Sequence, residues 1–155
     1  MKSIHHKNAF TIIELVFTIV IVGILAAVAV PRLAATRDDA EITKARTMVA
    51  SIRNALAMER QKRILRGNFD RIQAVGGINT GVFGNFEDNT SLPMVLEYAE
   101  QNSTDNGRWE FLTVGGTGTY RFHCRALGGN VDFTVSNNGR FICNNATHGC
   151  QQLTR

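Results

Sequence analysis

The chain has 155 residues and a formal net charge of +4, and two of its lysines, Lys2 and Lys7, lie in a short polar stretch ahead of a long apolar run. Removing these two charges from the +4 leaves an excess of +2, which argues against nucleic acid as the main partner. With a leader and a membrane segment set aside, the remainder suffices for one small domain, which argues against a second one.

Residues 10–30 form an apolar run that is interrupted only by Thr11, Glu14, Thr18 and Gly23. As a helix the run would span roughly 31 Å at about 1.5 Å per residue, which matches the roughly 30 Å hydrocarbon core of a bilayer. A carboxylate inside such a helix costs on the order of 3 kcal/mol, so Glu14 is expected to have a cationic partner. The nearest candidate is the amino group that a cut before Phe10 would create, in a neighbouring copy of the chain.

The segment Ala9-Phe10-Thr11-Ile12-Ile13-Glu14, after a polar leader with Lys2 and Lys7, resembles the prepilin processing signal of type IV pilins and type II secretion pseudopilins. The resemblance implies that a prepilin peptidase cuts between Ala9 and Phe10 and methylates the new amino group of Phe10. It also implies that Glu14 pairs with the amino terminus of an adjacent subunit. The family has Gly where this chain has Ala9, and because Ala is the smallest replacement, slower cleavage is expected rather than its loss.

The same resemblance implies further assembly residues and partners. Pro31 stands where the family places a helix-bending proline, and Gly23 would allow close approach of neighbouring helices. The implied partners are copies of the chain or other pilins, the prepilin peptidase, the inner-membrane assembly machinery, and membrane lipid before assembly. The implied location is the bacterial inner membrane, which the chain would cross once, with its head (residues 67–155) in the periplasm. After assembly the implied location is a pilus or a pseudopilus.

Two other interpretations of this segment stay open. A secretory signal peptide would have a basic start and a small-x-small site, which Ala27-Val28-Ala29 offers, but it would leave Glu14 unexplained. A plain signal anchor could instead carry a periplasmic domain that never polymerises. The positive-inside rule does not decide the orientation, because basic residues flank both ends of the run.

Residues 32–66 are predicted to continue the apolar helix as an amphipathic one, and we call the whole helix, residues 10–66, the stem. Apolar residues recur in steps of three and four, on one helical face, at Ile42, Ala45, Val49, Ile52 and Leu56. Gly67 suits the left-handed backbone conformation that the residue just past a helix end often adopts. A bend is expected at Pro31, which cannot donate a backbone hydrogen bond.

Beyond the helix we expect a connecting loop region over residues 67–107 and a sheet with a C-terminal cysteine loop over residues 108–155. The loop region is rich in Gly and Asn, and its apolar piece at residues 92–98 is interpreted as a short helical turn. Four strands are predicted at residues 109–114, 120–126, 131–135 and 140–143. The chain as a whole is therefore predicted to be α+β and pilin-like, with a leader at residues 1–9, an assembly helix at residues 10–31 and an antiparallel β-meander packed on the stem.

The turns between these strands predict their register. A two-residue turn at Gly128-Gly129 would pair Cys124 with Phe133, and a three-residue loop at Asn137-Asn138-Gly139 would pair Phe133 with Cys143. One face of the sheet, expected to pack against Val49, Ile52 and Leu56, would then carry Tyr120, Phe122, Cys124, Ala126, Val131, Phe133, Val135, Phe141 and Cys143.

The same register bears on the pairing of the three cysteines. Cys124 and Cys143 would lie two strands apart, near 10 Å, which exceeds the roughly 7 Å limit for the Cα atoms of a disulfide. Cys143 with Cys150 is the better pair, and it would resemble the C-terminal disulfide loop of many pilins. Cys124 is then a buried thiol, or a partner if the register differs; three reduced cysteines are the remaining alternative.

The sequence offers no motif for catalysis, so the chain is predicted not to be an enzyme and to need no cofactor. A zinc site at Cys143, His148 and Cys150 would lack a fourth donor, and only Asp132 follows Glu110 as an acidic ligand, so no metal is expected. The predicted function is a structural subunit of a type IV pilus or a type II secretion pseudopilus. The alternatives are a minor pilin that acts as a DNA-uptake receptor, and a membrane-anchored periplasmic domain that does not polymerise.

Overall fold

The computed structural model describes residues 10–114, 117–144 and 148–155. Within them the secondary structure is α1 (Ile12–Leu65), β1 (Val75–Gly77), β2 (Gly81–Phe86), β3 (Arg108–Val114), β4 (Thr117–Cys124), the 3-10 helix η1 (Arg125–Leu127), β5 (Gly129–Val135), β6 (Phe141–Cys143) and α2 (His148–Thr154). This is an α+β fold with a long N-terminal helix and antiparallel sheets, as the sequence predicted. The chain separates into two compact units between Asp38 and Asp39, so the unit that contains the sheets includes the C-terminal part of α1.

α1 ends where the sequence indicated. Gly67 has φ +75°, its N–H donates to the Ile64 carbonyl at 2.9 Å, and the Asn68 N–H donates to the Arg63 carbonyl at 2.9 Å. These two bonds form a Schellman motif, which satisfies carbonyls that the helix end would otherwise leave unpaired. The predicted apolar face is also confirmed, because Ala45, Val49, Ile52 and Leu56 are all buried in the core.

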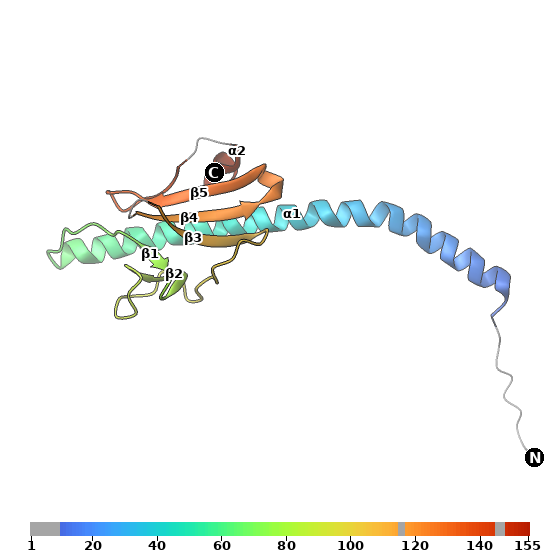
Figure 1. Cartoon of the computed structure of the whole chain (residues 1–155), viewed down its shortest axis with the longest axis horizontal. Coiled ribbons are helices and arrows are strands. Elements are labelled where there is room, and N and C mark those ends of the chain that lie inside the picture. The colour runs from blue at the N-terminus through green and yellow to red at the C-terminus, as the bar shows by residue number, and fades with distance from the viewer. Residues whose placement is uncertain (1–9, 115–116, 145–147) are drawn as a thin grey trace, which may run out of the picture. The chain divides into compact units, whose positions relative to one another are not determined.

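The larger sheet is a four-stranded antiparallel meander with the order β3-β4-β5-β6. Figure 1 shows β3, β4 and β5 next to one another. The predicted pairing of Phe133 with Cys143 is confirmed, and Gly139, with φ +67°, occupies the left-handed position of the loop before β6. The predicted pairing of Cys124 with Phe133 is wrong, because Cys124 pairs with Gly129 and Phe133 pairs with Tyr120. The connection between β4 and β5 contains η1 and is therefore longer than a two-residue turn.

Gly128 explains this difference. It caps η1 with φ +82°, and its N–H donates to the Arg125 carbonyl at 3.0 Å, so the chain leaves the strand at Cys124 instead of continuing to Ala126. Ala126 is consequently exposed, and Leu127 takes the buried position instead. The error in register is four residues, an even number, so the remaining side chains keep the predicted face.

That face packs against α1 as an aromatic core. Phe133 and Phe141 stack with ring centroids 4.9 Å apart, and Trp109 lies 5.0 Å from Phe122. Val49, Ile52 and Leu56 of α1 belong to the same buried cluster, whereas Cys143, at the edge strand, is only partly buried. The predicted packing of the sheet on the stem is therefore confirmed.

The region predicted as a connecting loop contains a second sheet, the β1-β2 hairpin. Residues 92–98 do not form the expected helical turn, and Met94 and Glu100 instead pair with Asn85 and Val82 of β2 through isolated bridges. The Tyr120 hydroxyl ties the hairpin to the meander, because it accepts a bond from the Val75 N–H at 2.8 Å and donates to the Gly76 carbonyl at 2.9 Å.

The turn of this hairpin is organised around the Asp88 carboxylate. It accepts backbone N–H bonds from Thr80 at 2.8 Å and from Asn79 at 3.0 Å, together with the side-chain amide of Asn79 and the hydroxyl of Thr80, both at 2.9 Å. Burial would raise the pKa of Asp88, but these hydrogen bonds together lower it below its usual 3.8. The charged carboxylate is therefore the form that stabilises the turn.

Asp88→Asn is expected to destabilise the domain by on the order of 1–3 kcal/mol at neutral pH, because a charged acceptor is lost. Since the folded pKa is below the unfolded one, the stabilising contribution is full above 3.8 and disappears as the pH falls through the lower folded value. Urea unfolding at a series of pH values measures this, with exposed Asp70→Asn as the matched control. If the free energies of unfolding of D88N and D70N depend on pH to the same extent, the charged Asp88 carboxylate does not stabilise the turn.

Candidate functional site

The first turn of α1 carries the acidic residue that the sequence singled out. Thr11 precedes the helix, and its hydroxyl oxygen accepts a hydrogen bond from the Glu14 N–H at 3.4 Å, as an N-cap residue does. Thr11 and Glu14 thus have the Thr-x-x-Glu spacing of a capping box. The sequence reasoning missed this N-cap, to which Glu14 contributes its backbone N–H, although the spacing was present to reveal it. The negative side chain also complements the positive end of the helix dipole.

The N-terminal part of α1 exposes its apolar side chains on all sides. Exposed fractions reach 74% for Phe10 and 83% for Ile12, and the most apolar 18-residue window of α1, with a mean hydropathy of 2.8, has 0% of its residues buried. By length and composition α1 can cross a membrane. Such a surface requires either lipid or other protein to cover it.

The predicted assembly residues are spread along this helix and do not converge on one point. Phe10 precedes α1, Glu14 is in its first turn, and both are exposed. Gly23 faces open space, with nothing within 4 Å of a Cβ added there, and Pro31 lies inside the continuous helix. Ala9, the other predicted processing residue, lies outside the residues that the structure describes.

Cys143 and Cys150 are joined in a disulfide with a Cα–Cα distance of 5.9 Å, and Cys124 is a free, buried cysteine. Cys150 belongs to α2, so part of the predicted cysteine loop is helical. Because the two sulfur atoms are bonded to each other, neither is available as a thiolate ligand for a metal.

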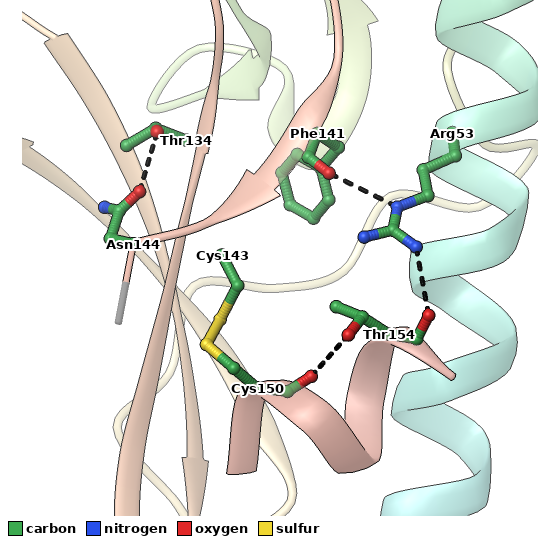
Figure 2. The surroundings of a disulfide bond; sticks show 7 residues. All are labelled: Arg53, Thr134, Phe141, Cys143, Asn144, Cys150 and Thr154. Carbon is green, nitrogen blue, oxygen red and sulfur yellow. Dashed lines mark hydrogen bonds between the residues drawn. A yellow bond between two sulfur atoms is a disulfide. The ribbon is translucent and has the colours of Figure 1, made fainter. Parts of the chain in front are cut away.

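Two arginines of α1 attach α2 to the rest of the domain. Arg53 donates through Nε to the Phe141 carbonyl at 3.2 Å and through Nη1 to the Thr154 carbonyl at 3.4 Å (Figure 2). Arg46 donates to the Gln152 carbonyl at 2.9 Å. Positive side chains at the last carbonyls of a helix satisfy unpaired acceptors and complement its dipole. The disulfide and these arginines together hold the C-terminal segment.

Replacing both Cys143 and Cys150 by Ser is expected to destabilise the domain by about 2 kcal/mol, because the unfolded chain regains the freedom of the closed loop. Urea unfolding of the full-length chain measures the loss, and hydrogen exchange of α2 should accelerate. A reducing agent should lower the stability of the parent chain and leave the double variant unchanged. A parent chain whose unfolding midpoint ignores the reductant would contradict this prediction.

The exposed apolar helix with its acidic first turn lies in the part of the chain that a known family model matches. Residues 4–30 match the family model described as the prokaryotic N-terminal methylation motif, so the predicted resemblance to the pilins and pseudopilins is confirmed for this segment. A relative named type II secretion system core protein G, from Vibrio cholerae serotype O1, is 38% identical over 58 residues, and one of the same name from Escherichia coli is 34% identical over 58 residues.

These similarities cover only part of the chain. Each match includes 37% of this chain and 40% of the relative, so the chain matches about two fifths of the length of these relatives. No solved structure matches the chain at a significant level.

Proposed function

We propose that this chain is a structural subunit of a type II secretion pseudopilus or a type IV pilus. The observation that carries the proposal is the fully exposed apolar stem with Glu14 in its first turn, inside a matched N-terminal methylation motif. A helix of this kind is stable in lipid, and it is equally stable in a bundle of parallel stems, where neighbouring helices replace the lipid. The role is structural, and no catalysis is part of it.

In this proposal the prepilin peptidase cuts between Ala9 and Phe10 and methylates the Phe10 amine. Glu14 of one subunit then pairs with that amine of its neighbour. Each charge alone is costly in an apolar surrounding, and pairing compensates both, so the correct axial position of a subunit is the one that brings them together. Gly23 allows close helix contact, and Pro31 bends the stem where it leaves the lipid.

We place the stem across the bacterial inner membrane, with the head in the periplasm, before assembly into the filament. A disulfide such as Cys143–Cys150 is favoured in an oxidising compartment, which supports this orientation. The partners are copies of the chain or other pilins, the assembly machinery of the inner membrane, and lipid before assembly.

Mass spectrometry of the mature chain tests the processing step directly. The expected N-terminal residue is Phe10 carrying one methyl group. A mature chain that begins at Met1, or after a cut near Ala27-Val28-Ala29, would overturn the proposal in favour of a signal anchor or a signal peptide.

The alternative of a DNA-uptake receptor is not favoured by the structure. Binding of single strands usually relies on exposed aromatic rings, and Trp109 and Tyr120 are 1% and 0% exposed, so neither can serve as a stacking platform. The similarity to proteins named type II secretion system core protein G also favours the pseudopilus over this alternative.

A further inference from the structure

A pocket of about 720 Å³ lies beside the C-terminal half of α1, in the unit formed by residues 39–155. Its volume is within the range of sites that hold a small ligand or a short peptide segment. One wall comes from α1 and the other from the loop before β6 and β6 itself. The lining residues are Arg53, Ala57, Arg60, Asn138, Gly139, Arg140, Phe141 and Ile142.

Three guanidinium groups line this pocket, and none of the described residues around it carries a carboxylate. Arg53 donates to the carbonyls of Phe141 and Thr154, which are neutral, so its charge is not compensated (Figure 2). Among the described residues, the guanidinium groups of Arg60 and Arg140 have neither an ion pair nor a hydrogen bond.

Some other arginines of the same unit are compensated by carboxylates. Arg121 and Arg108 each contact a carboxylate, at 2.8 Å and 3.3 Å. Glu59, next to Arg60 in the chain, is bound to Arg63 at 3.0 Å and so does not compensate Arg60. Like charges that share a partly enclosed pocket repel one another, and a bound anion relieves this repulsion.

The spacing of the arginines favours an elongated anion. Arg53 and Arg60 are seven residues apart, about 10.5 Å along the helix, with Ala57 between them. In a peptide in the extended polyproline II conformation, with three residues per turn and a rise of about 3.1 Å per residue, side chains three residues apart lie on the same face and about 9 Å apart. The oxygens of a single phosphate lie much closer together. Phe141 and Ile142 offer apolar contact to the side chains between the two acids.

We propose that this pocket binds an extended acidic peptide segment of a partner protein, with one carboxylate near Arg53 and a second between Arg60 and Arg140. Bonds between guanidinium groups and carboxylates are among the strong hydrogen bonds of proteins, and they provide both affinity and orientation. The inference goes beyond the proposed function, because the pocket lies within the unit formed by residues 39–155, does not include the apolar part of α1 and operates whether or not the stems assemble.

The test uses the full-length chain in detergent micelles and a fluorescein-labelled peptide, acetyl-Glu-Leu-Ala-Glu-amide, with fluorescence polarisation as the readout. We expect saturable binding that weakens as salt is added, since partly exposed charges are screened. The same peptide with Gln at both Glu positions should bind at least tenfold more weakly. Equal binding of the two peptides would overturn the proposal.

The decisive variant is Arg60→Gln combined with Arg140→Gln, which leaves Arg53 and its structural bonds in place. The matched control is Arg66→Gln with Arg125→Gln, which removes the same charge from exposed positions outside the pocket. Peptide affinity should fall tenfold or more in the first variant and less than threefold in the second. Urea midpoints of both variants that equal the midpoint of the parent chain establish that the fold is intact.

Three further outcomes would also overturn the proposal by assigning the pocket to another occupant. Displacement of the peptide by inorganic phosphate at equal concentration would indicate a small-anion site. Tighter, Arg60- and Arg140-dependent binding of a short DNA duplex would indicate nucleic acid. Weaker self-association of the Arg60 and Arg140 variant, without any peptide binding by the parent chain, would indicate a second copy of the chain.

Discussion

Glu14→Gln is expected to leave a processed, membrane-inserted and folded monomer that no longer assembles. The substitution removes the charge that would compensate the Phe10 amine of the neighbouring subunit. Breaking a buried ion pair by removing one partner costs about 3–5 kcal/mol, which corresponds to a loss of roughly a hundredfold or more in the assembly equilibrium. Cross-linking through single cysteines placed along the stem, with electron microscopy of sheared filaments, measures the loss.

Glutamine is the informative replacement because it keeps the capping function. Gln is accepted in place of Glu at the third helical position of a capping box, so E14Q removes the charge and retains the helix start. Thr11→Ala does the opposite: it removes the acceptor of the Glu14 N–H, costs about 1 kcal/mol and leaves the carboxylate.

Assembly should therefore fail in E14Q and survive in T11A. Exposed Glu97→Gln, in the head, controls for the loss of one negative charge. If T11A loses assembly as completely as E14Q does, then Glu14 acts by stabilising the helix, and the intersubunit pair is not needed.

The stem and the meander could be predicted from the sequence because each is encoded by local pattern. The apolar residues from Ala45 to Leu56 follow the helical period, and Gly67 marks the end of the helix with the backbone conformation it adopts most readily. In the meander, the alternation of side chains along each strand predicted the buried face correctly, although the turn between β4 and β5 was predicted wrongly. The Gly128 connection moved the register by four residues without exchanging the two faces of the sheet.

The β1-β2 hairpin was not predicted because its stability comes from contacts that no local pattern contains. Phe83, Glu87 and Asp88 have positive φ values of 60°, 56° and 50°, which non-glycine residues seldom adopt and which local propensity argues against. The hairpin is held by distant groups: Trp109, Tyr120 and Phe141 pack on the Phe83 ring, and the Tyr120 hydroxyl accepts a hydrogen bond from the Val75 N–H. Tertiary contacts of this kind override the local preference.

The two candidate sites also differ in whether a local sequence pattern encodes them. Glu14 could be found from the sequence, because a charge inside an apolar run is costly both in lipid and in a bundle of apolar helices. The arginine pocket could not, because Arg60 and Arg140 come from α1 and from a loop near the C-terminus and meet only when the sheet packs on the stem. A basic residue on an amphipathic helix is ordinarily a solvated one.

Phe83→Ala is expected to destabilise the domain by about 3–5 kcal/mol, the typical cost of removing a fully buried aromatic side chain. Phe83 is 0% exposed, and its ring lies 4.9 Å from Trp109, 5.2 Å from Tyr120 and 5.8 Å from Phe141. It is therefore the residue of the hairpin that fills the centre of the meander core. A loss of this size is a large fraction of the stability of an ordinary small domain.

Two matched variants separate the ring from the backbone strain at this position. Phe69→Ala removes the same atoms from a side chain that is 78% exposed and should change stability by less than about 0.5 kcal/mol. Phe83→Gly should be about 1 kcal/mol less harmful than F83A, because glycine adopts the positive φ without the cost that a Cβ imposes. Urea unfolding followed by the fluorescence of Trp109, the chain's one tryptophan, measures all three. A loss in F83A no larger than in F69A would show that the hairpin does not contribute to the core.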